Sequence, residues 1–174
     1  PAQVNFARVV REAIAMVLPL ADDAGREIDV EMDERVPILL QGYAADLRNM
    51  VRNLLDNALF HGKGKITVTL RSEAPQTDGA AAILRVQDEG AGVPEDLRET
   101  VFDRFRKGKA SSAGSGLGLA IVRHVAHRHG GFARVDPQAV NCIEIVLKPC
   151  RKPNDATLRA TERKKPRQSR PLCS

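Results

Sequence analysis

The stretch Leu47–Ala58, LRNMVRNLLDNA, carries the strongest pattern in the sequence. It lies within a helix predicted over residues 44–61, because its apolar side chains recur every three or four residues and form one continuous core stripe. That stripe consists of Leu47, Met50, Val51, Leu54, Leu55, Ala58 and Leu59. Gly62 follows and is expected to end the helix as a C-terminal cap.

Strand and helix patterns are mixed along the rest of the chain. Helical spacing predicts helices over residues 4–18, where Pro19 is expected to stop the helix, and 117–129, with a short helix over 95–101. Short or alternating apolar runs predict strands near 27–32, 66–70, 82–86, 132–136 and 142–148, and residues 36–40 form another short apolar segment. Residues 106–116 are rich in Lys, Gly, Ser and Ala and are expected to form a mobile loop. Since the elements do not strictly alternate, an α+β layered sandwich is favoured over a doubly wound sheet.

Composition and charge divide the chain into a body and a tail. With 174 residues and 43% hydrophobic side chains, the chain is expected to form one globular domain. Its net charge of +5 comes from the tail, because residues 151–174 carry +6 and the remainder −1. We therefore expect a domain over residues 1–149 and a basic, Pro-containing, disordered tail over 150–174. A tail contact with acidic partners, RNA or membrane stays open as an alternative.

Several classes of function are disfavoured for the domain itself. Aromatic residues make up 3% of the chain and Trp is absent, which argues against stacking platforms for single-stranded nucleic acid. The apolar run at residues 13–18 is shorter than the roughly 18 residues that a membrane span needs. The three cysteines form no CxxC pair, so neither a disulfide framework nor a zinc site is indicated. We expect a cytoplasmic domain that contacts neither nucleic acid nor membrane.

Three asparagines lie in one row on the strong helix. Asn49, Asn53 and Asn57 are spaced four residues apart, which places them on one line of the helix surface. Asparagine is a mediocre helix former, so three in a row are unexpected in a purely structural helix. Amide oxygens suit a hard cation and amide nitrogens suit phosphate. The alternative is a solvated polar face beside the core stripe.

Two glycine-rich segments indicate ligand contacts. Asp88–Pro94, DEGAGVP, follows a predicted strand, and its glycines allow a tight turn and close backbone approach, while Asp88 can accept a hydrogen bond from an amine. Gly114–Leu119, GSGLGL, opens a helix, where backbone N–H groups can bind an anion. The second segment matches neither a Rossmann fingerprint nor a P-loop. Each segment has a simpler reading, as a tight acidic turn and as an ordinary helix start.

The order of these features resembles the ATP-binding catalytic domain of bacterial sensor histidine kinases. The wider family includes gyrase, the heat-shock chaperone of the same fold and the mismatch-repair ATPases. The resemblance covers roughly residues 1–149. It rests on Leu47–Ala58 as the N box, Asp88–Val93 (DEGAGV) as the G1 box, Val101–Lys107 (VFDRFRK) as the F box and Ser112–Val122 (SAGSGLGLAIV) as the G2 box. It implies the Bergerat ATP-binding fold, an α+β two-layer α/β sandwich whose mixed sheet is covered on one face by about three helices.

The resemblance also implies ATP and Mg²⁺ as ligands and assigns residues to them. Asn57 would coordinate the Mg²⁺ that bridges the ATP phosphates, with Asn53 assisting. Asp88 would bind the adenine amino group, and residues 95–115 would form a lid over ATP. The implied nucleotide-binding set is Asn53, Asn57, His61, Asp88, Gly90, Gly92, Val93, Phe105, Lys107, Gly114, Gly116, Leu117 and Gly118, with Asn57 and Asn53 as the metal ligands.

The sequence departs from the family pattern at three positions. Phe60 and His61 stand where the family often has a basic residue and Tyr; His61 could replace the Tyr contact, but Phe60 cannot replace a cation. Asn53 stands where the water-splitting relatives carry Glu as general base. An amide cannot accept that proton, which favours phosphoryl transfer to a protein side chain over ATP hydrolysis.

The expected phosphoacceptor is absent from this sequence. None of the four histidines has the setting of a phosphoacceptor helix, and His124, His127 and His129 are interpreted as a polar helix end rather than a metal cluster. We therefore expect the acceptor histidine on a separate dimerisation domain upstream, and a cognate response regulator as the later partner. The remaining alternatives are an anti-sigma-factor-type serine kinase, a non-catalytic nucleotide-sensing module of the same fold and, last, a basic nucleic-acid-binding protein that binds through residues 151–174.

Overall fold

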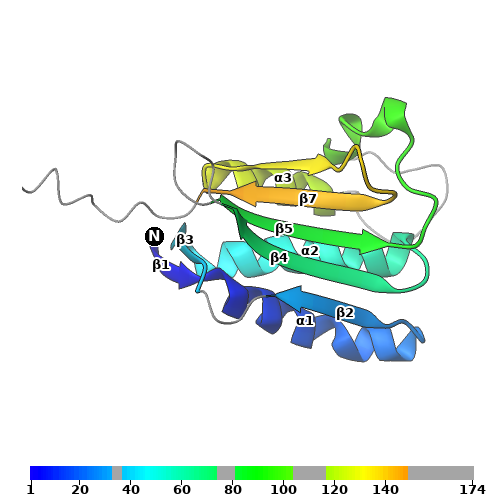
Figure 1. Ribbon diagram of the computed structural model, residues 1–174, viewed down its shortest axis with the longest axis horizontal. Helices are drawn as coiled ribbons and strands as arrows, with labels where there is room; N and C mark the ends of the chain where they lie inside the picture. The colour runs from blue at the N-terminus through cyan, green and yellow to red at the C-terminus, as the bar shows by residue number, and fades with distance from the viewer. Residues whose placement is uncertain (33–36, 74–80, 104–116, 149–174) are drawn as a thin grey trace, which may run out of the picture.

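The computed structural model of the protein describes residues 1–32, 37–73, 81–103 and 117–148 (Figure 1). The predicted mobile loop and the predicted tail lie outside these residues. A sheet forms one layer and three helices lie together on one side of it. The predicted α+β fold class is confirmed. No helix in the described ranges combines the length and apolarity needed to cross a membrane.

The main sheet has five strands in the order β2-β4-β5-β7-β6. β2 runs parallel to β4, and the other neighbours are antiparallel, so the sheet is mixed. The strands are β2 (Ile28–Met32), β4 (Ile66–Glu73), β5 (Ala81–Asp88), β6 (Phe132–Val135) and β7 (Cys142–Leu147). Alternate residues of β4, β5 and β7 face the helices and are buried, as the period of two requires. Asp88 ends β5, which places its carboxylate at an end of the sheet.

The three helices are α1 (Phe6–Asp23), α2 (Ala44–His61) and α3 (Gly118–Arg128). The seven residues of the predicted stripe are all buried on α2, which packs between α1 and α3. Two short 3₁₀ helices, Glu95–Leu97 and Thr100–Phe102, occupy the segment where one short helix was predicted. A separate two-stranded sheet pairs β1 (Ala2–Asn5) with β3 (Leu39–Gly42).

Helix α1 differs from its prediction at both ends. Residues 2–5 form a strand, and the Asn5 side chain accepts a hydrogen bond from the Arg8 backbone N–H at 3.3 Å as an N-cap. Pro19 does not stop the helix, which continues to Asp23. Ala15 and Pro19 are both exposed, so the carbonyl that proline leaves without a donor can be solvated. Ala21 is fully buried and continues the apolar face of α1, so its burial stabilises one more helical turn.

Helix α3 runs antiparallel to α2 and contacts it at both ends. At its start, Gly118 lies against the Asn53 side chain of α2. At its end, the His129 Nε2 accepts a hydrogen bond from the Tyr43 backbone N–H at 3.3 Å, and its Nδ1 lies 2.8 Å from the Val125 carbonyl oxygen. These two contacts fix the register of α3 along α2.

Candidate functional site

The carboxylate of Asp88 is held by three hydrogen bonds to one of its oxygens. The backbone N–H groups of Lys63 and Gly90 donate to Oδ1 at 3.1 and 2.7 Å, and the Asn141 side-chain amide Nδ2 donates to the same atom. Asp88 is 7% exposed. Among the described residues, none donates a hydrogen bond to Oδ2. The second oxygen is therefore available to a donor on a ligand.

Glycines let the backbone approach this carboxylate from two sides. A Cβ on Gly62 would lie closer than 3.0 Å to the Asp88 carboxyl group, and one on Gly90 would lie 2.7 Å from Asp88 Oδ1. Gly62 does end α2, as predicted, but with a φ of −88° rather than the left-handed geometry of a glycine cap. Its glycine is required by the close approach of Asp88 and not by backbone conformation.

The end of α2 is fixed by Arg26. A left-handed Gly25 ends α1, and the Arg26 side chain then reaches the last turn of α2. Its Nη1 donates to the carbonyl oxygens of Ala58 and Leu59 at 2.7 and 2.9 Å, and its Nε donates to that of Gly64 at 2.7 Å. The cation thus pairs with the negative end of the helix dipole. These hydrogen bonds from Arg26 also stabilise the turn after α2, which supplies the Lys63 N–H to Asp88.

The middle of α2 meets the start of α3 at Asn53. The Asn53 Nδ2 donates to the Asn49 carbonyl oxygen at 2.7 Å. The amide oxygen of Asn53 is therefore the atom of this side chain that can accept or coordinate a ligand. A Cβ on Gly118 would lie 3.2 Å from that oxygen. The N-terminal N–H groups of α3 therefore lie beside an amide oxygen of the asparagine row, which combines donors for an anion with an acceptor for a cation.

Asp56 is a partly buried carboxyl group next to the asparagine row. Its Oδ1 is buried and has no hydrogen-bond partner among the described residues, and its Oδ2 lies 3.6 Å from Arg52 Nε. Desolvation raises the pKa of the Asp56 carboxyl above its ordinary value, and the charge of Arg52 opposes that rise in pKa. Burial thus disfavours the charged form of the Asp56 carboxyl group.

The structure brings together some of the predicted site residues and leaves others apart. Asp88 and Gly90 are in direct contact, and Asn53 contacts Gly118. Asn57 is half-buried one turn along α2 from Asn53, and His61 is exposed in its last turn. The others are Gly92, next to Asn141; Val93, packed against the core; and Leu117, the N-cap position of α3. Phe105, Lys107, Gly114 and Gly116 lie outside the described residues.

Two residues of this site were missed by sequence reasoning. Asn141 lies in the turn between β6 and β7, with a φ of +52°. An asparagine just before a predicted strand is a usable turn signal, since Asn tolerates the left-handed region. Arg26 carries no such signal, because its partners at the end of α2 are more than thirty residues away along the chain.

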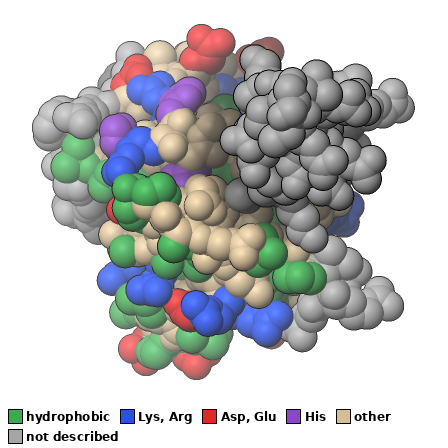
Figure 2. Space-filling model, turned by 90° about the vertical axis from the view of Figure 1, so that its left-hand side faces the viewer, with side chains coloured by type: hydrophobic (Ala, Val, Ile, Leu, Met, Phe, Trp, Pro, Cys, Tyr) green, Lys and Arg blue, Asp and Glu red, His purple; other side chains and the backbone are tan. Residues whose placement is uncertain are grey.

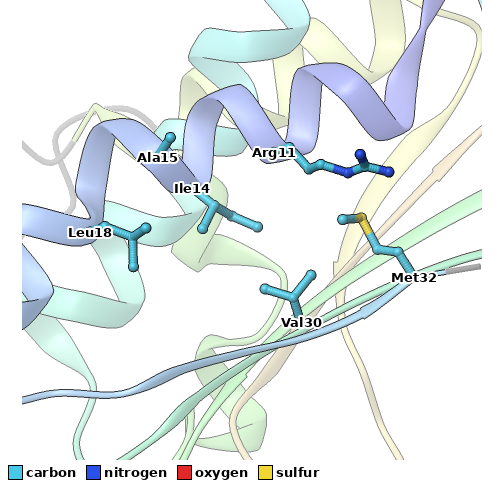
Figure 3. Close-up of a pocket in the computed structure, with 6 residues that line it drawn as sticks. All are labelled: Arg11, Ile14, Ala15, Leu18, Val30 and Met32. Atoms are coloured by element: carbon cyan, nitrogen blue, oxygen red, sulfur yellow. The ribbon is translucent and has the colours of Figure 1, made fainter. Parts of the chain in front are cut away.

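A separate groove lies on another part of the domain. It has a volume of about 320 Å³ between α1 and β2 and is lined by Arg11, Ile14, Ala15, Leu18, Val30 and Met32. Figure 3 shows the helix side chains facing those of the strand across this space. None of the predicted nucleotide-binding residues lines it, so it is not the predicted site.

The histidines of α3 belong to its polar end. Figure 2 shows histidine side chains gathered beside basic side chains on one face of the domain. His127 and Arg128 occupy the last turn of α3, and His129 is engaged by Tyr43 and Val125. No group of three or more His, Cys, Asp or Glu side chains within the described ranges could hold a metal ion.

The mixed sheet, the polar row on α2 and the carboxylate framed by glycines define a nucleotide-binding domain. The chain belongs to the family of histidine kinase-, DNA gyrase B- and HSP90-like ATPases, which matches residues 42–153.

Known sensor kinases are similar to this chain. It is 45% identical over 138 residues to the signal transduction histidine-protein kinase/phosphatase MprB of Mycobacterium sp. (strain KMS), covering 76% of this chain and 25% of the relative. It is 37% identical over 132 residues to the sensor-type histidine kinase PrrB of Mycobacterium tuberculosis (strain ATCC 25618 / H37Rv), covering 74% of this chain and 29% of the relative. The solved structure of a mycobacterial sensor histidine kinase MprB matches with a TM-score of 0.71 at 34% identity, covering 86% of this chain and 99% of that one. The chain thus spans between a quarter and a third of the length of the curated relatives it matches.

Proposed function

We propose that this chain is the ATP-binding catalytic domain of a sensor histidine kinase, which presents Mg²⁺-ATP for transfer of the γ-phosphoryl group to a histidine on a separate dimerisation domain. The single observation that carries the proposal is the Asp88 carboxylate, which has three donors on one oxygen and, within the described part of the chain, none on the other. Such a domain works in the cytoplasm, where ATP is supplied. A response regulator would receive the phosphoryl group afterwards.

The Asp88 site suits adenine. An ionised carboxylate accepts a hydrogen bond from the exocyclic amine of adenine, whereas guanine presents a carbonyl oxygen there and would place two acceptors against each other. A buried mismatch of this kind costs about 1–3 kcal/mol, and more with a charged group. The adjoining glycines allow the flat base to lie close to the backbone.

The asparagine row suits the other end of the nucleotide. Gly62 follows Asn53 by nine positions along α2 and its cap, a rise of about 13.5 Å, which an extended nucleoside triphosphate can span. The residues present fit a hard cation, since the Asn53 Nδ2 is engaged and its Oδ1 lies beside the start of α3. Amide oxygens are ligands that hard cations prefer. Asn53 and Asn57 would hold Mg²⁺. When bound, the ion neutralises phosphate charge.

The chemistry at position 53 favours transfer to a protein side chain over hydrolysis. Asn53 cannot take a proton from water, and its Nδ2 is already engaged by the Asn49 carbonyl. The protein therefore supplies binding, orientation and electrostatics, and the nucleophile comes from a partner domain. The names of the relatives, which are histidine kinases, support this acceptor over a serine.

Calorimetric titration of the chain with Mg²⁺-ATP tests the metal assignment. Asn57→Ala should weaken binding at least tenfold in the presence of Mg²⁺. Asn49→Ala is the matched control, because it makes the same change on the same row at an exposed position, and it should bind like the wild type. Equal affinities of the two variants would overturn the assignment.

Phosphate release over hours tests the reaction class. The chain with Mg²⁺-ATP should turn over negligibly, whereas a dimerisation domain bearing an acceptor histidine should become phosphorylated when it is added. Robust steady-state hydrolysis that is lost in Asn57→Ala would place the chain with the ATP-hydrolysing members of the family. Tight ATP binding without transfer to any acceptor domain would favour a nucleotide-sensing module.

A further inference from the structure

Asn141 has an unusual backbone conformation at the edge of the proposed base site. Its φ of +52° is the one positive value among the non-glycine residues that the structure describes. This region is unfavourable for L-residues, and asparagine tolerates it better than most. A conformation of this kind persists where surrounding contacts determine it.

Those contacts tie Asn141 to Asp88 twice. The Asn141 carbonyl oxygen accepts a hydrogen bond from the Asp88 backbone N–H at 3.3 Å. The Asn141 side-chain Nδ2 donates to Asp88 Oδ1. The left-handed backbone therefore places both the carbonyl and the side-chain amide of one residue against the same partner.

The glycine segment after β5 lies close to both the side chain and the backbone of Asn141. A Cβ on Gly90 would lie 2.9 Å from Asn141 Nδ2, and one on Gly92 would lie 3.3 Å from the Asn141 backbone nitrogen. Both distances are tighter than ordinary van der Waals contact. The two glycines thus admit Asn141 as well as a ligand, and Asn141 belongs to the wall of this site.

We infer that Asn141 is the positioning residue for base recognition: by binding Oδ1 it fixes the rotation of the Asp88 carboxylate, so that Oδ2 faces the ligand and selects adenine over guanine. The inference rests on the proposed function. The terminal torsion of an aspartate is broad, so without donors on one oxygen the carboxylate plane would turn and its other oxygen would not be held toward the ligand. Lys63 and Gly90 supply backbone donors, and Asn141 supplies the one side-chain donor to Asp88 within the described part of the chain.

Asn141→Gly isolates the amide, because glycine adopts the positive φ without strain and keeps the backbone carbonyl that Asp88 uses. Titration of the full chain with Mg²⁺-ATP and with Mg²⁺-GTP should give an ATP affinity about 10- to 100-fold weaker than that of the wild type. The GTP affinity should change little, so the ratio of the two falls. Thermal unfolding should move down only as far as the loss of one hydrogen bond to a charged group predicts. Both affinities are measured well below that temperature, which separates this effect from a loss of structure.

Two further variants complete the test. Gln138→Gly introduces the same flexibility into the same turn, and it should keep the wild-type ratio of ATP to GTP affinity. Asp88→Asn should lose most of the discrimination, and adding Asn141→Gly to it should cause no further loss. An unchanged affinity ratio in Asn141→Gly, with Asp88→Asn still impaired, would overturn the positioning role alone. Wild-type ATP binding in Asp88→Asn would instead overturn the proposed base site, and the inference with it.

Discussion

Replacing Gly62 with alanine should damage the Asp88 site through steric overlap rather than through backbone strain. The φ of −88° at Gly62 is accessible to alanine, so the added methyl group meets no conformational penalty. The methyl would lie closer than 3.0 Å to the Asp88 carboxyl group and to the Ala58 carbonyl oxygen, where ordinary contact begins near 3.4 Å. Either the carboxylate or the end of α2 must move.

The cost follows from what must shift. Overpacking of a well-packed site costs about 1–3 kcal/mol. If the carboxylate moves, its three hydrogen bonds to Oδ1 weaken together, and hydrogen bonds to charged groups are worth about 1.5–3 kcal/mol each without being additive. We expect the free energy of unfolding to fall by about 2–4 kcal/mol, and ATP affinity to fall at least tenfold in the chain that remains folded.

Urea unfolding and calorimetric titration of the same preparations measure both effects. Gly130→Ala is the matched control, since Gly130 has a φ of +70° and nothing within 4 Å of the added Cβ. It should lose about 1–2 kcal/mol through strain and keep its ATP affinity. If Gly62→Ala matched the wild type in stability and affinity, or if it matched Gly130→Ala in both, the steric argument would be refuted.

Three other substitutions test the surroundings of the site. Arg26→Met should lower the free energy of unfolding in urea by about 1–3 kcal/mol, because carbonyls at the end of α2 lose their donors, and Arg26→Lys should recover part of the loss. Burial raises the pKa of the Cys142 thiol to about 11 from an ordinary value of 9.0. Because the folded chain keeps this proton to higher pH than the unfolded chain, the free energy of unfolding should fall between pH 9 and pH 11. The fall should be less steep in Cys142→Ala. The raised pKa of Asp56 means that its contribution to stability is greatest in acid and is lost as pH rises through that pKa, so Asp56→Asn should stabilise the chain at pH 7 and not at pH 3.

The central helix could be predicted from the sequence because its pattern is long and unbroken. α2 begins and ends at the predicted residues, since seven apolar positions specify one buried face. α1 was predicted less well because a proline is a local signal, whereas the burial of Ala21 that extends the helix depends on tertiary packing. Local rules describe a helix best where no long-range contact competes with them.

Sequence reasoning selected individual residues of the candidate site but not the contacts that join them. Asp88 and Gly90 could be selected because a carboxylate followed by glycines suggests ligand chemistry in a short window. Their partner Asn141 lies more than fifty residues away, and only the pairing of β5 with β7 brings it to Asp88. Gly62 was predicted only as a helix cap, because nothing in the neighbouring sequence reveals that the Asp88 side chain at the end of β5 approaches it.

The antiparallel packing of α3 on α2 restricts the number of residues in α3, because both ends of the helix contact α2. About ten residues separate its first contact, at Gly118, from its last, at His129, and about ten separate the matching positions Asn53 and Tyr43 on α2. One residue inserted into α3 would turn everything beyond it by about 100° and advance it by about 1.5 Å. His129 would then point away from Tyr43, or Gly118 would leave Asn53. α3 thus tolerates exchange of its outward side chains far more readily than any change in their number.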